Sequence, residues 1–64
     1  MKDNHIKLNH TYALKNCKHA WNNGRIVIIA EIRKDENGNI EYLAKDYPDQ
    51  IFSYLVSAKN LSAK

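Results

Sequence analysis

The densest apolar stretch of the chain lies at residues 25–34, which read Arg-Ile-Val-Ile-Ile-Ala-Glu-Ile-Arg-Lys and predict a β-strand. Alternate side chains of a strand point to opposite faces. One face is wholly apolar and is expected to point into the core; it carries Ile26, Ile28, Ala30 and Ile32. The other face is apolar only in mid-strand, at Val27 and Ile29, which suits a strand covered there by another layer or by a partner.

A tight turn follows at residues 35–39, which read Asp-Glu-Asn-Gly-Asn. Asn-Gly between apolar runs is the strongest short-range signal for a β-hairpin. A two-residue loop would place Ile32 opposite Leu43, whereas a three-residue loop that ends at Gly38 in a left-handed conformation places Ile32 opposite Tyr42. The second register keeps the apolar face unbroken, so we expect the bulged turn.

The return strand is expected at residues 40–45, which read Ile-Glu-Tyr-Leu-Ala-Lys. In the bulged register Ala30 lies opposite Ala44. Residues 46–49 end this strand, because Pro48 has no N–H to offer a sheet and biases the residue before it away from helix.

Two other segments fit more than one structure. Residues 11–23 fit a helix, with Leu14, Cys17 and Trp21 on one stripe. They also fit a short strand that is followed by a loop from Asn16 to Gly24. Residues 50–60 begin with a run of β formers, which favours a strand followed by a 3₁₀ turn, although a helix that starts after Pro48 also fits.

The order of these elements is similar to that of SH3-like small barrels of the KOW and Tudor type, which include many short phage and bacterial proteins. In those folds the last long strand leads into a single 3₁₀ turn and a final short strand. Residues 54–61, Tyr-Leu-Val-Ser-Ala-Lys-Asn-Leu, resemble that ending, and residues 9–14 would be the first strand. The resemblance covers residues 9–62 and carries no catalytic signature.

The resemblance implies a mostly β fold with a closed sheet that acts as a binding module. We expect a single SH3-like domain at residues 9–62, built from about five short antiparallel strands around the 25–34/40–45 hairpin, after a ragged N-terminus at residues 1–8. The alternative is an α+β fold in which helices replace the ambiguous segments on both sides of the hairpin.

Length and composition limit what the chain can do. Its 64 residues make one domain, and 44% of them are hydrophobic, which permits one small core. A lone cysteine, Cys17, rules out an internal disulfide framework. The first ten residues are too polar for a signal peptide, and the longest apolar run, residues 26–30, is far too short to cross a bilayer. We therefore expect a cytoplasmic protein without a membrane partner.

Charge is distributed unevenly along the chain. Residues 1–34 carry seven Lys and Arg against two Asp and Glu, a net +5, while residues 35–64 carry a net −2. All three histidines fall in the basic half. Such asymmetry predicts a basic face that could meet phosphates or an acidic protein.

Signals for chemistry are weak. His10, Cys17 and His19 match neither the number nor the spacing of ligands in a structural zinc site, and Cys17 has no third group to orient a histidine partner. Gly24 and Gly38 both lie at turns, so no glycine-rich loop is present to hold phosphates. We expect a protein that is not an enzyme, with no cofactor, no metal and no small-molecule substrate.

Two functional hypotheses follow. The first is a small regulatory or inhibitory protein, of the kind phages and mobile elements encode, that docks on a protein partner or on a second copy of itself. Its contact residues would be Trp21, Val27, Ile29 and Leu43. The second is a nucleic-acid-binding SH3-like module that contacts DNA or RNA phosphates through the basic half and stacks bases on aromatic rings. Its phosphate contacts would be Lys15, Lys18, Arg25 and Arg33.

Overall fold

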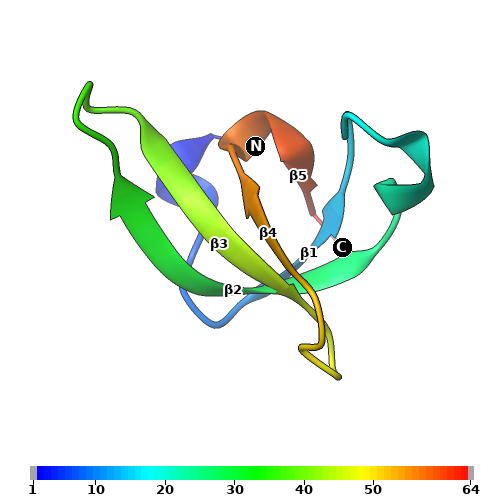
Figure 1. Ribbon diagram of the computed structural model, residues 1–64. Coiled ribbons are helices and arrows are strands. Elements are labelled where there is room, and N and C mark those ends of the chain that lie inside the picture. The colour runs from blue at the N-terminus through cyan, green and yellow to red at the C-terminus, as the bar shows by residue number, and fades with distance from the viewer. Residues whose placement is uncertain (1, 64) are drawn as a thin grey trace.

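A computed structural model describes residues 2–63 as one curved antiparallel sheet with three single-turn 3₁₀ helices (Figure 1). The strands are β1 (Thr11–Leu14), β2 (Ile26–Lys34), β3 (Ile40–Asp46), β4 (Ser53–Val56) and β5 (Leu61–Ser62). The 3₁₀ helices are η1 (Asp3–His5), η2 (Ala20–Asn22) and η3 (Ala58–Asn60).

The five strands lie in the order β4-β3-β2-β1-β5, and every neighbouring pair is antiparallel. Figure 1 shows that β2 bends strongly and that η3 carries the chain from β4 across to β5. The prediction of a mostly β fold is confirmed, and the alternative with helices is wrong for residues 2–63, which contain no α-helix. The arrangement is consistent with a small SH3-like barrel.

The central hairpin has the predicted turn. Asp35 and Gly38 close it, since the Gly38 N–H donates to the Asp35 carbonyl (3.0 Å) and the Asp35 N–H donates to the Asn39 carbonyl (2.9 Å). Gly38 adopts φ +85°, the left-handed region that a bulged three-residue loop requires. Ile32 lies opposite Tyr42, so the register predicted next to the turn is confirmed.

A β-bulge at Ala30 changes the register farther along β2. Ile29 pairs with Ala44 and Glu31 pairs with Leu43, so Ala30 has no partner and its predicted pairing with Ala44 is wrong. An extra residue in one strand shifts its alternation by one. The faces predicted for β2 are therefore reversed on the β1 side of the bulge.

Burial shows this reversal directly. Val27 and Ile29, expected on the outer face, are both 0% exposed in the core. Ile32 lies on the turn side of the bulge, opposite the buried Tyr42, but is 47% exposed because it extends beyond the edge of the core. The remaining residues assigned to the inner face, Ile26, Ile28 and Ala30, are only half-buried. The assumption of strict alternation along residues 25–34 was wrong because of the bulge at Ala30. Nothing in the composition of these residues marks that bulge.

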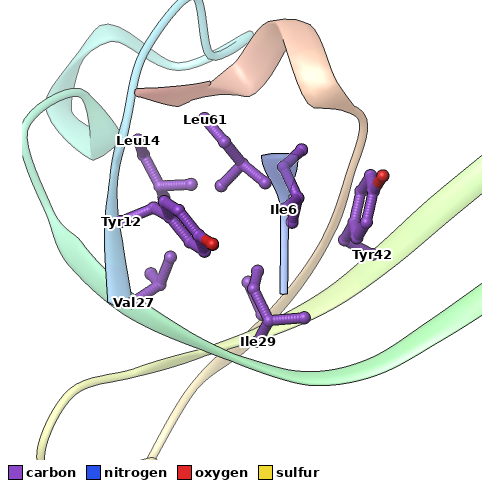
Figure 2. Close-up of a cluster of buried hydrophobic side chains, with 8 residues drawn as sticks. Ile6, Tyr12, Leu14, Val27, Ile29, Tyr42 and Leu61 are labelled. Carbon is purple, nitrogen blue, oxygen red and sulfur yellow. The ribbon is translucent and has the colours of Figure 1, made fainter. Parts of the chain in front are cut away.

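Eight buried side chains form the core, and seven of them are labelled in Figure 2, where they converge from β1, β2, β3, β5 and the N-terminal segment. Ile6, from the segment expected to be ragged and outside the domain, is 5% exposed among them. The core is completed by Tyr12, Leu14, Val27, Ile29, Tyr42, Ala44 and Leu61. The packed domain thus begins before residue 9.

Two tyrosines hold the N-terminal segment (residues 2–8) on the sheet. The hydroxyl of Tyr12 accepts from the Lys7 N–H (2.9 Å) and donates to the His5 carbonyl (3.3 Å). The hydroxyl of Tyr42 donates to Asp3 Oδ1 (2.6 Å). Burial of the Tyr42 ring, together with this bond to a carboxylate, raises the pKa of the phenol.

Candidate binding groove

A groove of about 460 Å³ lies between the loop that joins β1 to β2 (the β1–β2 loop, residues 15–25) and the segment from β4 to η3. It brings together two segments that lie far apart in the sequence. Its lining comprises Leu14, Asn16, Cys17, Lys18, His19, Asn22, Tyr54, Leu55, Val56, Lys59 and Asn60.

Apolar side chains form the floor of the groove. Cys17, Tyr54 and Val56 are half-buried and pack against the core, and Leu14 is itself a core residue at 2% exposure. The rim is polar, with amide side chains and the cations Lys18 and Lys59. No Asp or Glu is among the residues that line it, so the groove favours an anionic occupant with apolar side chains.

Asn60 joins the two walls of the groove. Its side-chain Nδ2 donates to the carbonyls of Lys15 (3.2 Å) and Asn16 (3.1 Å), and its Oδ1 accepts from the Ser57 N–H (3.2 Å). The backbone adds a bond from the Lys15 N–H to the Asn60 carbonyl (2.8 Å). In return Asn16 Nδ2 donates to the Lys59 carbonyl (3.2 Å). These bonds fix the distance between the β1–β2 loop and η3.

Hydrogen bonds also close the base of the β1–β2 loop. The Cys17 N–H donates to Asn23 Oδ1 (3.0 Å), and the Gly24 N–H donates to the Leu14 carbonyl (2.8 Å). Gly24 at φ +88° and Asn16 at φ +54° supply the two left-handed turns that the loop needs. The loop is therefore held away from β4 by its own hydrogen bonds.

Tyr54 is anchored in the floor through its hydroxyl, which donates to Asp46 Oδ1 (3.0 Å). Burial first and this hydrogen bond second raise the pKa of Tyr54. Arg25 lies 3.9 Å from the other oxygen of the Asp46 carboxylate. Asp46 is thus engaged from both sides, and the Tyr54 ring stays neutral as part of an apolar surface.

An aromatic stack stands at the rim. The rings of His19 and Trp21 lie 4.5 Å apart with an interplanar angle of 17°. Trp21 is 72% exposed, and its neighbours His19 and Asn22 line the groove. An indole held in this way offers a large flat surface next to the cationic rim.

Strand β4 forms another wall with an open edge. It is the terminal strand of the sheet and pairs on one side with β3. Three consecutive residues, Tyr54, Leu55 and Val56, line the groove, although successive side chains of a strand point to opposite faces. The groove therefore runs along the backbone edge of β4 and not across one of its faces.

Further apolar side chains are exposed next to this edge. Leu55 on the outer face of β4 is 57% exposed, and the preceding turn exposes Ile51 (71%), Phe52 (62%) and Tyr47 (47%). Contiguous exposed apolar surface of this kind usually marks a site of protein contact.

The predicted protein-binding residues are separated by the fold. Trp21 is exposed at the rim of the groove, as expected of a loop aromatic. Val27 and Ile29 lie in the core and contact no solvent, so the docking face predicted for them does not exist. Leu43 is half-buried on the outer face of the sheet, between Glu31 and Leu55 on the neighbouring strands.

The four predicted phosphate contacts do not form one surface either. Lys18 lines the groove, and Lys15 lies beside it at the end of β1. Arg25 bonds Asn22 Oδ1 through Nε (3.2 Å) and faces Asp46. Arg33 lies near the hairpin turn, with its guanidinium on both carboxylate oxygens of Glu31 (3.2 and 3.3 Å).

Lys59, Leu55 and Asn60 are groove residues that the sequence patterns did not single out. The available signal was the resemblance of residues 54–61 to a strand followed by a 3₁₀ turn and a last short strand. That arrangement brings Lys59 next to the β1–β2 loop only when the antiparallel pairing of β5 with β1 is also known. Sequence spacing alone separates Lys18 from Lys59 by most of the chain.

Known proteins suggest no function for the groove. The chain matches no protein-family model, no curated protein and no solved structure. Within residues 2–63, no three His, Cys, Asp or Glu side chains gather closely enough to hold a metal ion. None of the helices in that range has the length and apolar character needed to cross a membrane.

Proposed function

We propose that the chain is an SH3-like small barrel, of the KOW and Tudor type that its element order resembles, and that it works as a non-enzymatic regulatory module. It binds a segment of a protein partner in the groove between the β1–β2 loop and β4. The observation that carries the proposal is the open backbone edge of β4 along a groove with an apolar floor and a cationic rim.

Protein contact is favoured by the chemistry of the surfaces around the groove. The exposed side chains of Trp21, Leu55 and Phe52 border or continue it, and aromatic and aliphatic anchors of this kind contribute most of the free energy at protein interfaces. The walls are held by side-chain hydrogen bonds of Asn60, so a partner segment meets a preformed site. Preformed sites lose less conformational entropy on binding.

Binding of DNA or RNA is the second candidate, and the His19–Trp21 stack beside Lys18 supports it. Against it, Arg25 and Arg33 are both engaged with carboxylates, and Arg33 lies near the hairpin turn. A nucleic acid would therefore meet few free cations in one place. The two candidates differ in salt dependence, since each phosphate contact lowers log K by about 0.7 to 0.9 per tenfold rise in salt.

The proposal is tested by blocking the groove at Cys17, the chain's single cysteine, which lines the floor. Random peptides displayed on phage are selected for binding to the protein. The affinity of the selected peptides is then measured for protein whose Cys17 thiol carries either a bulky maleimide or a small methylthio group. We expect the bulky group to weaken binding at least about fivefold and the small group to change it little, because loss of a packed anchor costs more than about 1 kcal/mol and about 1.4 kcal/mol is tenfold.

Arg33→Ala is the matched control, because Arg33 is remote from the groove and its removal should leave peptide binding unchanged. Circular dichroism of each modified protein shows whether the fold is retained. Selected peptides that bind equally to the bulky adduct would contradict the proposed site. Tight, steeply salt-dependent binding of mixed single-stranded DNA or RNA, in place of peptides, would support the second candidate.

A further inference from the structure

The backbone groups of β4 define what kind of segment the groove can accept. The Asp46 N–H donates to the Phe52 carbonyl (3.0 Å), and hydrogen-bonded pairs in an antiparallel ladder recur at every second residue. Tyr54 and Val56, which pair with Ala44 and Tyr42, therefore point their backbone groups at β3. Ser53 and Leu55 point theirs away from β3.

No hydrogen bond to the outward backbone groups of Ser53 or Leu55 occurs within the part of the chain that the structure describes. Two N–H groups and two carbonyls thus face outward along the open edge of β4, and Leu55, which supplies one of each, lines the groove. Unpaired edges of this kind are templates for a further strand. Peptide recognition by strand addition uses such main-chain bonds for affinity and flanking pockets for specificity.

Charge selects among the segments that could add to β4. Lys18 and Lys59 lie on the rim, Lys15 lies beside it, and no carboxylate of residues 2–63 lines the groove. The floor under the added strand is apolar through Leu14, Cys17, Tyr54 and Val56. A strand that alternates apolar and acidic side chains matches both features, with one face on the floor and carboxylates near the lysines.

Building on the proposed function, we infer that the partner segment is an acidic, extended peptide that adds to β4 as a sixth strand of the sheet, bonded to Ser53 and Leu55. A second copy of the chain does not fit as well, because pairing two β4 edges would bring the Lys18 and Lys59 side chains of both copies together. A nucleic acid offers no alternating N–H and carbonyl groups to this edge.

The probe is a short labelled peptide of alternating glutamate and valine, whose binding is followed by fluorescence anisotropy. Its counterpart with lysine in place of glutamate tests charge, and we expect it to bind at least about tenfold more weakly. Two further forms carry N-methyl groups on either the valines or the glutamates. Consecutive N–H groups of a strand point to opposite edges, so only one of the two sets can face β4.

We expect one N-methylated form to lose at least about tenfold in affinity and the other to bind as the parent does, since two lost hydrogen bonds correspond to about that factor. On the protein side, Leu55→Pro removes the outward N–H without touching the bonds to β3, and proline is tolerated on edge strands. Leu55→Ala is its control, because it removes the same side chain and keeps the N–H.

The outcomes separate this inference from the proposed function. Equal binding of the parent and both N-methylated peptides, or equal binding by Leu55→Pro and Leu55→Ala, would overturn strand addition while the groove proposal stands. Preferred binding of the lysine peptide would overturn the acidic partner. If no peptide, of this design or from the displayed library, is sensitive to the bulky adduct at Cys17, the groove itself is wrong.

Discussion

Two irregular, polar segments of this protein lie next to the same sheet and behave differently. The N-terminal segment buries Ile6 in the core and is held by tyrosine hydroxyls, whereas the β1–β2 loop is held away from β4 and leaves Trp21 72% exposed. Each contains one 3₁₀ turn, η1 or η2, so local conformation does not distinguish them. The difference lies in where each segment finds its hydrogen-bond partners.

For the N-terminal segment the partners are side chains that rise from the core, so the segment is drawn down onto it. For the β1–β2 loop they are Asn60 in η3 and the loop's own Asn23, which keep the groove open. One segment should therefore contribute mainly to stability and the other mainly to binding. Substitutions in the two segments test this division of roles, and Ile6→Ala has the largest expected effect.

Ile6→Ala should destabilise the protein by about 2 to 3 kcal/mol, at the lower end for a buried aliphatic truncation, because a terminal segment can shift to fill part of the cavity. Urea unfolding followed by circular dichroism measures the change. Leu8→Ala, in the same segment but 48% exposed, is the control and should cost far less. Equal, small effects of both substitutions would mean that the segment is not part of the packed domain.

Asn60→Ala should cost about 1 to 2 kcal/mol, because it removes a side chain that bonds two carbonyls of the β1–β2 loop and caps η3. Here stability and binding are expected to fall together, since the distance between the groove walls changes. The exposed Asn37→Ala in the hairpin turn is the matched control. An Asn60 variant of normal stability would show that the loop is held by other contacts.

Tyr42→Phe should cost about 1 kcal/mol near neutral pH, since Asp3 is exposed and water can replace part of the lost bond. A pH series is more specific. Tyr42 has a raised pKa in the folded state, mainly from burial, so its contribution is present below the ordinary tyrosine pKa of about 10 and is lost as the pH rises above it. The stability gap between wild type and Tyr42→Phe should therefore narrow in alkali; a constant gap would contradict the assigned bond.

Gly24 and Gly38 compare the base of the loop with the hairpin turn. Both have φ near +85° to +88°, and an added Cβ would meet nothing within 4 Å at either one. Substitution by alanine should then cost at least about 1 kcal/mol at both sites through backbone conformation alone. Asparagine, which tolerates the left-handed region, should cost less at each. Thermal unfolding of the four variants checks this, and a neutral Gly38→Ala would argue against the bulged turn.

The central hairpin shows which structural features could be predicted from the sequence and which could not. Asn-Gly and the apolar pattern were enough to predict the turn, the Ile32–Tyr42 pairing and the mostly β fold. The bulge at Ala30 was not predictable, because it leaves no local signature in the sequence, although it bends β2 in the structure. That single residue moved Val27 and Ile29 from the predicted docking face into the core.

The candidate site was predictable only in part, for a related reason. Trp21 and Lys18 were identifiable because an exposed aromatic and a cation in a polar loop are local features. Lys59 and the free edge of β4 depend on non-local pairing, which places η3 beside the end of β1. Ile6 was assigned to the ragged N-terminus because Ile6 and Leu8, two apolar residues among polar ones, are too few to define a period.

Trp21→Ala is the smallest expected change in stability and the sharpest test of the division between the two segments. The indole is 72% exposed and stacks on His19, which is itself exposed, so the free energy of unfolding should change by less than about 0.5 kcal/mol. Binding of the labelled glutamate–valine peptide should nevertheless weaken several-fold, because the rim loses its aromatic surface. Trp21→Phe keeps a ring and should retain most of the affinity. A variant that unfolds more easily would place Trp21 with Ile6 as a structural residue, and one that binds peptide as wild type does would exclude the indole from the site.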